Sequence, residues 1–98
     1  MSARSFDLNG NKRQDNITIL NGESIKEVVL HTTVVVSIQP NQIVLNSGGY
    51  RTNTTKTAIN RALTQLDNSN RVVQIKGKWF LTDGVNKVEF FDNMAIYL

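Results

Sequence analysis

The stretch NSGGYRTNTTKTAINRAL, residues 46–63, decides how the chain is organised. A glycine pair is followed by hydroxyl-bearing residues and then by a helical pattern, in which apolar residues recur at i, i+1, i+4, i+5 and i+8 from Ala58. A threonine or asparagine within residues 52–54 can cap the first turn. The stretch therefore predicts a turn followed by one helix over about residues 54–66, with its apolar stripe on a core.

Segments on both sides of this helix have the composition of strands. In VVVSI, residues 34–38, alternation places Val34, Val36 and Ile38 on the core face. Asn21-Gly22 predicts a tight hairpin turn, because both central positions of such a turn take positive φ. The order of strands, helix and strands predicts an α+β fold, in which an antiparallel β-meander sheet carries a single helix on one face. The other strand-like runs are residues 17–20, 24–30, 43–46, 71–75, 78–81, 87–91 and 95–98.

Length and composition are those of one small domain. The 98 residues are 40% hydrophobic and 19% charged, an ordinary globular balance. We expect residues 1–12 to form a flexible N-terminal arm and residues 13–98 to form a single small α+β domain. There is no cysteine, hence no disulfide framework and no thiolate metal site. No apolar run approaches the roughly 18 residues of a membrane-spanning helix, and residues 1–10 lack the apolar core of a signal peptide, so we expect no membrane partner.

The formal net charge of +3 is unevenly distributed along the chain. Residues 1–45 are balanced, and residues 83–98 have a net charge of −2. Residues 46–82 contain six basic side chains and one acid, Asp67, so their net charge is +5. The basic excess coincides with the predicted helix and the strands that follow it, which favours an anionic partner.

The start of the predicted helix has the character of an anion-binding site. A helix N-terminus presents unpaired N–H groups and a partial positive charge, and residues 54–66 contain no acid and place Lys56 in the first turn. Gly48 and Gly49 allow a ligand to approach the backbone closely, and Arg51 precedes the helix. Such a site favours a phosphate or a carboxylate. The alternative interpretation is that the glycines form a turn, the threonines cap the helix and the basic side chains are solvated.

The segment KGKWF, residues 76–80, interleaves basic and aromatic side chains, a pattern that can hold a nucleic-acid backbone and stack its bases. In a strand, Trp79 faces away from Lys78 and Phe80, so one aromatic ring is expected to be exposed beside Lys78. The alternative is that both rings lie in cores. The candidate binding residues are Gly48, Gly49, Tyr50, Arg51, Thr54, Thr55, Lys56, Arg61, Arg71, Lys76, Lys78 and Trp79.

Catalytic chemistry has little support in the sequence. His31 is the only histidine, and no acid or cysteine lies near it in the sequence. No pair of carboxylates has the spacing that acid–base work on one helix face requires. The pair Gly48-Gly49 lacks the other glycines of a dinucleotide fingerprint and the Gly-Lys-Ser/Thr of a phosphate-binding loop. We therefore expect no enzyme activity, no catalytic residue, no metal site and no cofactor.

Three motifs resemble those of small proteins encoded by tailed bacteriophages, cyanophages among them. They are SGGYRTNTTKTAIN at residues 47–60, V-x-Q-x-K-G-x-W-F at residues 72–80, and F-x-D-x-M at residues 90–94. The similarity is of the SGGYRTxTTK type, and those proteins commonly have tryptophan where this chain has Tyr50. The resemblance implies an accessory protein in the cytoplasm of a bacterial host, and it implies no particular mechanism.

These observations favour a small, phage-encoded, non-enzymatic binding module that contacts nucleic acid or another polyanion. The basic segment and the acid-free helix start motivate this hypothesis, with Tyr50 or Trp79 available to stack on bases. A second hypothesis is a host-takeover or inhibitor protein that docks on a bacterial protein through exposed strand edges. A third is a structural component of the virion, which would be a symmetric oligomer. The sequence leaves the oligomeric state open.

Overall fold

The computed structural model describes residues 17–98 and has the predicted α+β architecture. Within these residues there is one helix, α1 (Asn53–Gln65), whose bounds lie within one residue of the prediction. The predicted N-terminal arm, residues 1–12, lies outside the described residues. The strands are β1 (Ile17–Asn21), β2 (Lys26–Leu30), β3 (Thr33–Ile38), β4 (Gln42–Leu45), β5 (Arg71–Ile75), β6 (Lys78–Thr82), β7 (Lys87–Glu89) and β8 (Met94–Tyr97).

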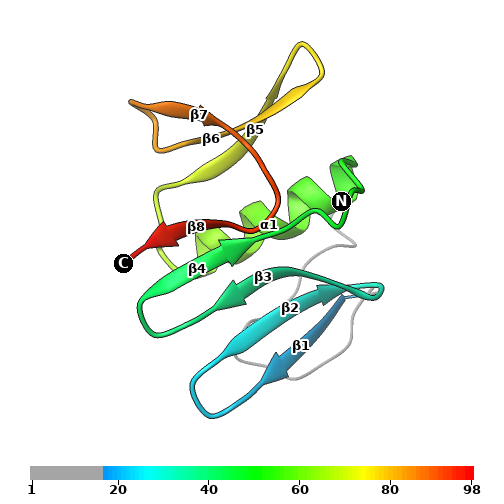
Figure 1. Cartoon of the computed structure of the whole chain (residues 1–98), viewed down its shortest axis with the longest axis vertical. Helices are drawn as coiled ribbons and strands as arrows, with labels where there is room; N and C mark the ends of the chain where they lie inside the picture. Colours follow the sequence, from blue (N-terminus) through cyan, green and yellow to red (C-terminus); the bar gives the residue numbers. More distant parts are fainter. Residues whose placement is uncertain (1–16) are drawn as a thin grey trace.

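The strands form two antiparallel sheets (Figure 1). In the five-stranded sheet, β1 to β4 follow one another as a meander, and β8 returns from the end of the chain to pair with β4. In the three-stranded sheet, β5, β6 and β7 form a second meander. The meander order is thus confirmed. The predicted single sheet is divided into two, and residues 90–93 carry the chain from β7 back to the edge of the first sheet.

Helix α1 joins the two sheets. It packs against β2 and β3 of the five-stranded sheet and against β5 of the other. Four residues of its predicted apolar stripe are buried, and the fifth, Leu66, is partly buried at the C-cap. The side-chain amide of Asn60 donates a hydrogen bond to the Val72 carbonyl (2.9 Å), and its oxygen accepts one from the Val72 N–H (2.7 Å). The helix is therefore fixed to the start of β5 by both polar atoms of one side chain.

The predicted core face of β3 is wrong in part, because the strand contains a β-bulge. The register with β2 shifts at Val35, so Val35 and Val36 are both fully buried whereas Val34 is half-buried. An extra residue in one strand interrupts the alternation of faces on which the prediction depends. The Val35 carbonyl accepts a hydrogen bond from the Asn46 N–H at 3.0 Å. The bulge thus connects β3 to the start of the loop that leads into α1.

The tight turn predicted at Asn21-Gly22 is also wrong, although the hairpin is present. Neither Asn21 nor Gly22 has positive φ. The Gly22 N–H donates a hydrogen bond to the Ile25 carbonyl at 2.8 Å, so the turn is centred on the two residues between Gly22 and Ile25. The register between β1 and β2 places the buried side chains of β1 on the core, and it thereby fixes the length of the loop between the two strands. The two-residue turn with positive φ lies instead at Lys76-Gly77, with φ of 51° and 82°, between β5 and β6.

We predict that Gly48→Ala lowers the free energy of unfolding by at least about 2 kcal/mol. Gly48 has φ of 63°, and a Cβ atom at this position would lie 2.6 Å from Cγ2 and 2.7 Å from Oγ1 of Thr33. Rotation of the threonine leaves one of these two atoms in the way. Urea unfolding measures the loss.

Gly49→Ala is the matched control for this prediction. Gly49 has φ of 85°, but a Cβ atom there would meet nothing within 4 Å. Only the backbone strain remains, which costs about 1 kcal/mol. Equal losses in the two variants would contradict the close approach of Gly48 to Thr33.

Candidate functional site

The glycine turn that was predicted to receive an external anion is folded around an internal one. Asp92, which precedes β8, places Oδ1 2.8 Å from the backbone N of Ser47 and 2.7 Å from its hydroxyl oxygen. The Ser47 side chain is 1% exposed, and its oxygen accepts hydrogen bonds from the Gly49 N–H and from Nε of Arg51, both at 3.2 Å. The loop between β4 and α1 is therefore closed by a carboxylate of the chain itself.

These contacts hold the pKa of Asp92 below its ordinary value. Burial is the largest single effect and acts in the opposite direction, since it raises the pKa. The N–H and hydroxyl of Ser47, the charge of Arg51 and the N–H of Gly49 all lower the pKa, and together they outweigh burial. The loop thus stabilises the ionised carboxylate.

Arg51 and Trp79 belong to the same cluster. The guanidinium carbon of Arg51 lies 4.9 Å from the ring centre of Phe90 and 5.5 Å from that of Trp79, within the range of cation–π contacts. The two rings meet edge to face with their centres 5.4 Å apart. Trp79 is 2% exposed, so its ring has no face available to a nucleic-acid base. Phe80, the next residue of β6, faces outward beside Lys78 and is half-buried. Nζ of Lys87 lies 5.3 Å from the centre of the Phe80 ring.

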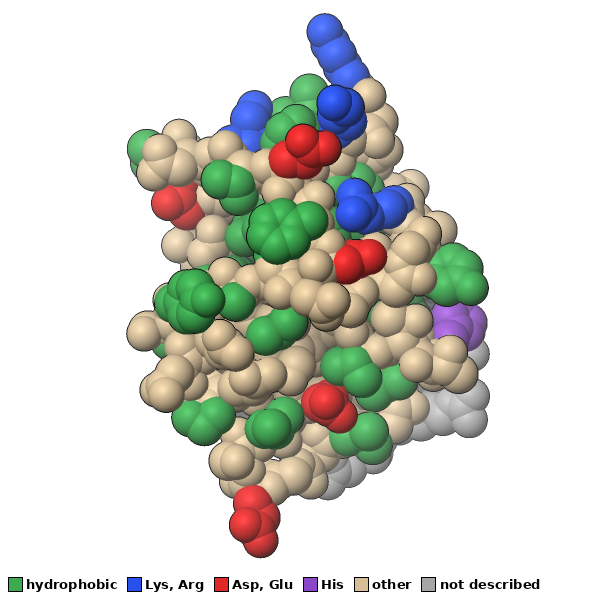
Figure 2. All heavy atoms as spheres, in the orientation of Figure 1, with side chains coloured by type: hydrophobic (Ala, Val, Ile, Leu, Met, Phe, Trp, Pro, Cys, Tyr) green, Lys and Arg blue, Asp and Glu red, His purple; other side chains and the backbone are tan. Residues whose placement is uncertain are grey.

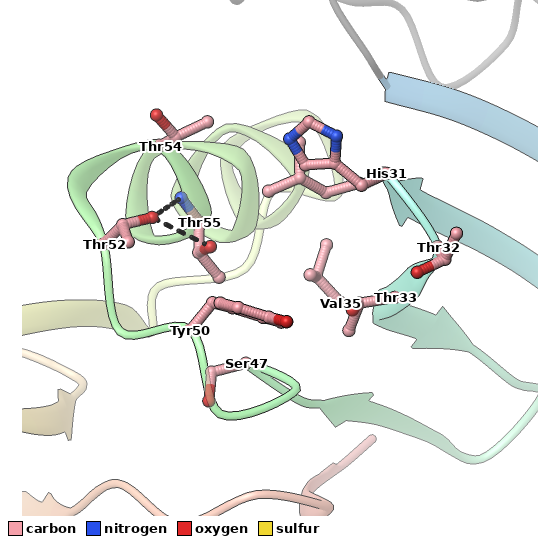
Figure 3. A pocket seen from close by; sticks show the side chains of 10 residues that line it. His31, Thr32, Thr33, Val35, Ser47, Tyr50, Thr52, Thr54 and Thr55 are labelled. Carbon is pink, nitrogen blue, oxygen red and sulfur yellow. Dashed lines mark hydrogen bonds between the residues drawn. The ribbon is translucent and has the colours of Figure 1, made fainter.

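A pocket of about 450 Å³ opens beside the loop, between the β2–β3 turn and the start of α1 (Figure 3). Leu30 and Val35 make its floor apolar, and hydroxyl groups make most of its walls. Thr52 caps α1 at its edge, since its hydroxyl accepts a hydrogen bond from the Thr55 N–H (3.3 Å). The lining residues are Leu30, His31, Thr32, Thr33, Val35, Ser47, Tyr50, Thr52, Thr54 and Thr55.

This lining suits a small polar group without charge. Among residues 17–98, no aspartate, glutamate, lysine or arginine lines the pocket. In the same part of the chain, no group of three or more His, Cys, Asp and Glu side chains is arranged to hold a metal ion. The hydroxyl and imidazole groups can donate and accept hydrogen bonds, which is recognition chemistry rather than acid–base chemistry between paired groups.

Two arginines of the candidate set form hydrogen bonds within the fold, and the third lies elsewhere on α1. Arg51 is bound to Ser47, as described above. Nη1 of Arg71 donates hydrogen bonds to the carbonyls of Asn68 and Asn70, which fixes the loop between α1 and β5. Arg61 is half-buried further along α1. The structure therefore does not bring the arginines into one basic surface.

The lysines, in contrast, all lie on or beside the β5–β6 hairpin. Nζ of Lys56, in the first turn of α1, lies 3.2 Å from Oε1 of Gln74 in β5. Lys76 is in the hairpin turn and Lys78 begins β6; both are exposed. We call these three residues, Lys56, Lys76 and Lys78, the lysine cluster.

A comparison with protein-family models matches residues 3–97 to the Kyanoviridae Gp96 protein. The chain belongs to the Kyanoviridae Gp96 protein family. This confirms the resemblance to small phage proteins of the cyanophage kind. Neither the curated proteins nor the solved structures give a match to the chain. Within the described residues, no helix has the length and hydropathy to cross a bilayer.

In this member of the Kyanoviridae Gp96 family, Asp92 closes the loop and Thr33 lines the pocket, although neither is among the candidate residues. Asp92 lies 45 positions from Ser47, and its only sequence signal is its place in the ending F-x-D-x-M. Thr33 and His31 reach the pocket because the β2–β3 turn places them opposite the start of α1. No local pattern reports either arrangement, since both depend on strand pairing.

We predict that Asp92→Asn lowers the free energy of unfolding by about 1–3 kcal/mol at neutral pH, because the Ser47 hydrogen bonds lose their charged acceptor. The pKa of Asp92 in the folded protein is below its ordinary value of 3.8. Its contribution is therefore full above that value and is lost as pH falls through the lower, folded-state pKa. Urea unfolding as a function of pH measures the effect.

The wild type and the variant should converge in stability as the medium becomes acidic. Glu23→Gln removes a charge of the same sign from an exposed turn and is the control. Introduced into both proteins, it should leave the difference in stability between the wild type and Asp92→Asn unchanged. A stability gap that stays constant into strong acid would show that the ionised Asp92 is not what the loop binds.

Proposed function

We propose that this Kyanoviridae Gp96 family member is a non-enzymatic binding module that holds the phosphate backbone of a single-stranded nucleic acid. The observation that carries the proposal is the lysine cluster. Three lysines lie on or against one hairpin: Lys56 of α1 contacts Gln74 in β5, and Lys76 and Lys78 belong to the β5–β6 hairpin itself.

The surroundings of the lysine cluster support an anionic partner. Neither residues 53–65 of α1 nor residues 71–82 of the β5–β6 hairpin contain an acid. Figure 2 shows the Lys and Arg side chains of the visible face over the end formed by the three-stranded sheet, with Asp and Glu side chains also present there. Lysine ammonium groups displace counterions from a phosphate backbone, which is the main source of affinity in such complexes.

A binding role without catalysis agrees with the composition of the pocket. His31 is exposed at its rim, and no carboxylate of residues 17–98 lines it. A histidine without an acidic partner lacks a group that would orient it for proton transfer. As a phage protein that binds nucleic acid, it would act in the cytoplasm of the bacterial host.

A second candidate function, docking on a host protein, has one observation in its favour. Large apolar side chains are exposed toward the C-terminus, and hydrophobic side chains are visible over the same region in Figure 2. Exposed apolar patches often mark protein-binding surfaces. The exposed side chains are Val88, Phe91, Tyr97 and Leu98.

We predict that the triple variant Lys56→Gln/Lys76→Gln/Lys78→Gln loses most of its affinity for single-stranded DNA or RNA. Fluorescence anisotropy with labelled strands of about 15 nucleotides, between about 50 and 200 mM salt, measures the affinity. With one phosphate neutralised per lysine, the log–log dependence of affinity on salt should become shallower by about 2 in the triple variant.

The control removes one positive charge of the same kind elsewhere. Lys26 lies in β2, in the five-stranded sheet. The variant Lys26→Gln should bind the labelled strands almost as tightly as the wild type does. Equal affinity and equal salt dependence in the wild type and the triple variant would reject the proposed function. A specific complex with one host protein that forms without nucleic acid, and is lost in Phe91→Ala/Tyr97→Ala, would instead favour docking.

A further inference from the structure

We propose that the pocket between the β2–β3 turn and α1 receives a nucleoside, with the ring of Tyr50 stacked on the base. The inference rests on the proposed function, because the expected source of the nucleoside is one unpaired residue of the strand that the lysine cluster holds. The pocket volume, about 450 Å³, lies within the range of roughly 300–1,000 Å³ that is usual for small-molecule sites.

Tyr50 is positioned for stacking by a fixed backbone and an exposed ring. Its N–H donates to the Ser47 carbonyl at 3.0 Å, so it belongs to the loop that Asp92 closes. Its side chain is 67% exposed, and Figure 3 shows it extending from the loop toward Thr33 and Val35. Because the backbone is already ordered and the side chain has few rotatable bonds, stacking of a base on this ring orders little else.

The polar groups across the pocket can recognise the edges of a base or a sugar. Among the described residues, no group accepts from or donates to the side chains of His31, Thr32 and Thr33. Imidazole and hydroxyl groups each offer a donor and an acceptor. The edges of an unpaired base and the sugar hydroxyls of RNA need such partners, and the apolar floor suits the plane of the base.

The distribution of charge separates the nucleoside from its phosphates. The described lining contains no charged side chain apart from His31 when that residue is protonated, so the pocket fits a neutral ring better than an anion. Lys56 directly follows the lining residue Thr55 in the first turn of α1, and its Nζ reaches the β5–β6 hairpin. The pocket and Lys56 therefore lie at the same end of the helix, where a strand could pass from the pocket toward the β5–β6 hairpin.

Tyrosine variants test this inference. Tyr50→Leu should bind oligouridylate or oligothymidylate about fivefold or more weakly than the wild type, the effect of losing one stacked base, with an unchanged salt dependence. Tyr50→Phe keeps the ring and should retain most of the affinity. Tyr97→Leu is the matched control, since Tyr97 is also exposed, at 79%, but lies in β8 away from the pocket. Circular dichroism confirms that each variant is folded.

A second arm, NMR titration with uridine or thymidine monophosphate, separates the possible sources of the nucleoside. Shifts confined to His31, Thr33 and Tyr50, and lost in Tyr50→Leu, support the pocket. If Tyr50→Leu binds strands as the wild type does and the monophosphates shift nothing, the pocket inference is overturned, whatever the lysine variants show. If the monophosphates bind but strands bind independently of the lysine cluster, the nucleoside site stands and the proposed function fails.

Discussion

The hydrogen bonds between the Asp92 carboxylate and Ser47 are the contact on which the rest of the structure depends. They join the segment before β8 to the loop before α1, two parts of the chain that are 45 residues apart. Arg51 extends the contact to the aromatic pair Trp79 and Phe90, and so to the three-stranded sheet. One ionised group therefore fixes the return of β8 to the first sheet, the start of the helix and the approach of the second sheet.

This arrangement separates the side chains that hold the fold from those that are available to a partner. Arg51, Arg71 and Trp79 have basic or aromatic character, but each is bound or buried by the chain itself. Tyr50, Lys76 and Lys78 are exposed parts of the basic segment, and Lys56 is half-buried. Arg51 is also exposed, but its side chain is bound to Ser47. The Asp92 carboxylate already accepts the hydrogen bonds of Ser47 in the glycine loop. We therefore propose that an external anion binds the lysines and that the loop holds the backbone of Tyr50 in place.

The parts of the fold that local chemistry determines were predictable from the sequence. The apolar stripe from Ala58, the cap at Thr52 and the strand-like runs follow from the spacing of neighbouring residues, and the structure has all of them. The bulge at Val35 and the return of β8 to β4 were not predictable, because they depend on pairing between distant segments. The same is true of the site: Gly48 and Tyr50 were found from the motif, whereas Asp92 and Thr33 reach it only through tertiary structure.

The most direct test of the central claim is an NMR titration of the Asp92 side-chain carboxyl carbon, recorded together with the amide protons of Ser47 and Gly49. If Asp92 is the anion that closes the loop, its carboxyl titrates below the ordinary value of 3.8. Both amide protons then shift with the same midpoint, and Arg51→Gln raises that midpoint because it removes the neighbouring positive charge. A carboxyl that titrates at the ordinary value, with Ser47 and Gly49 amides that do not follow it, would contradict the account.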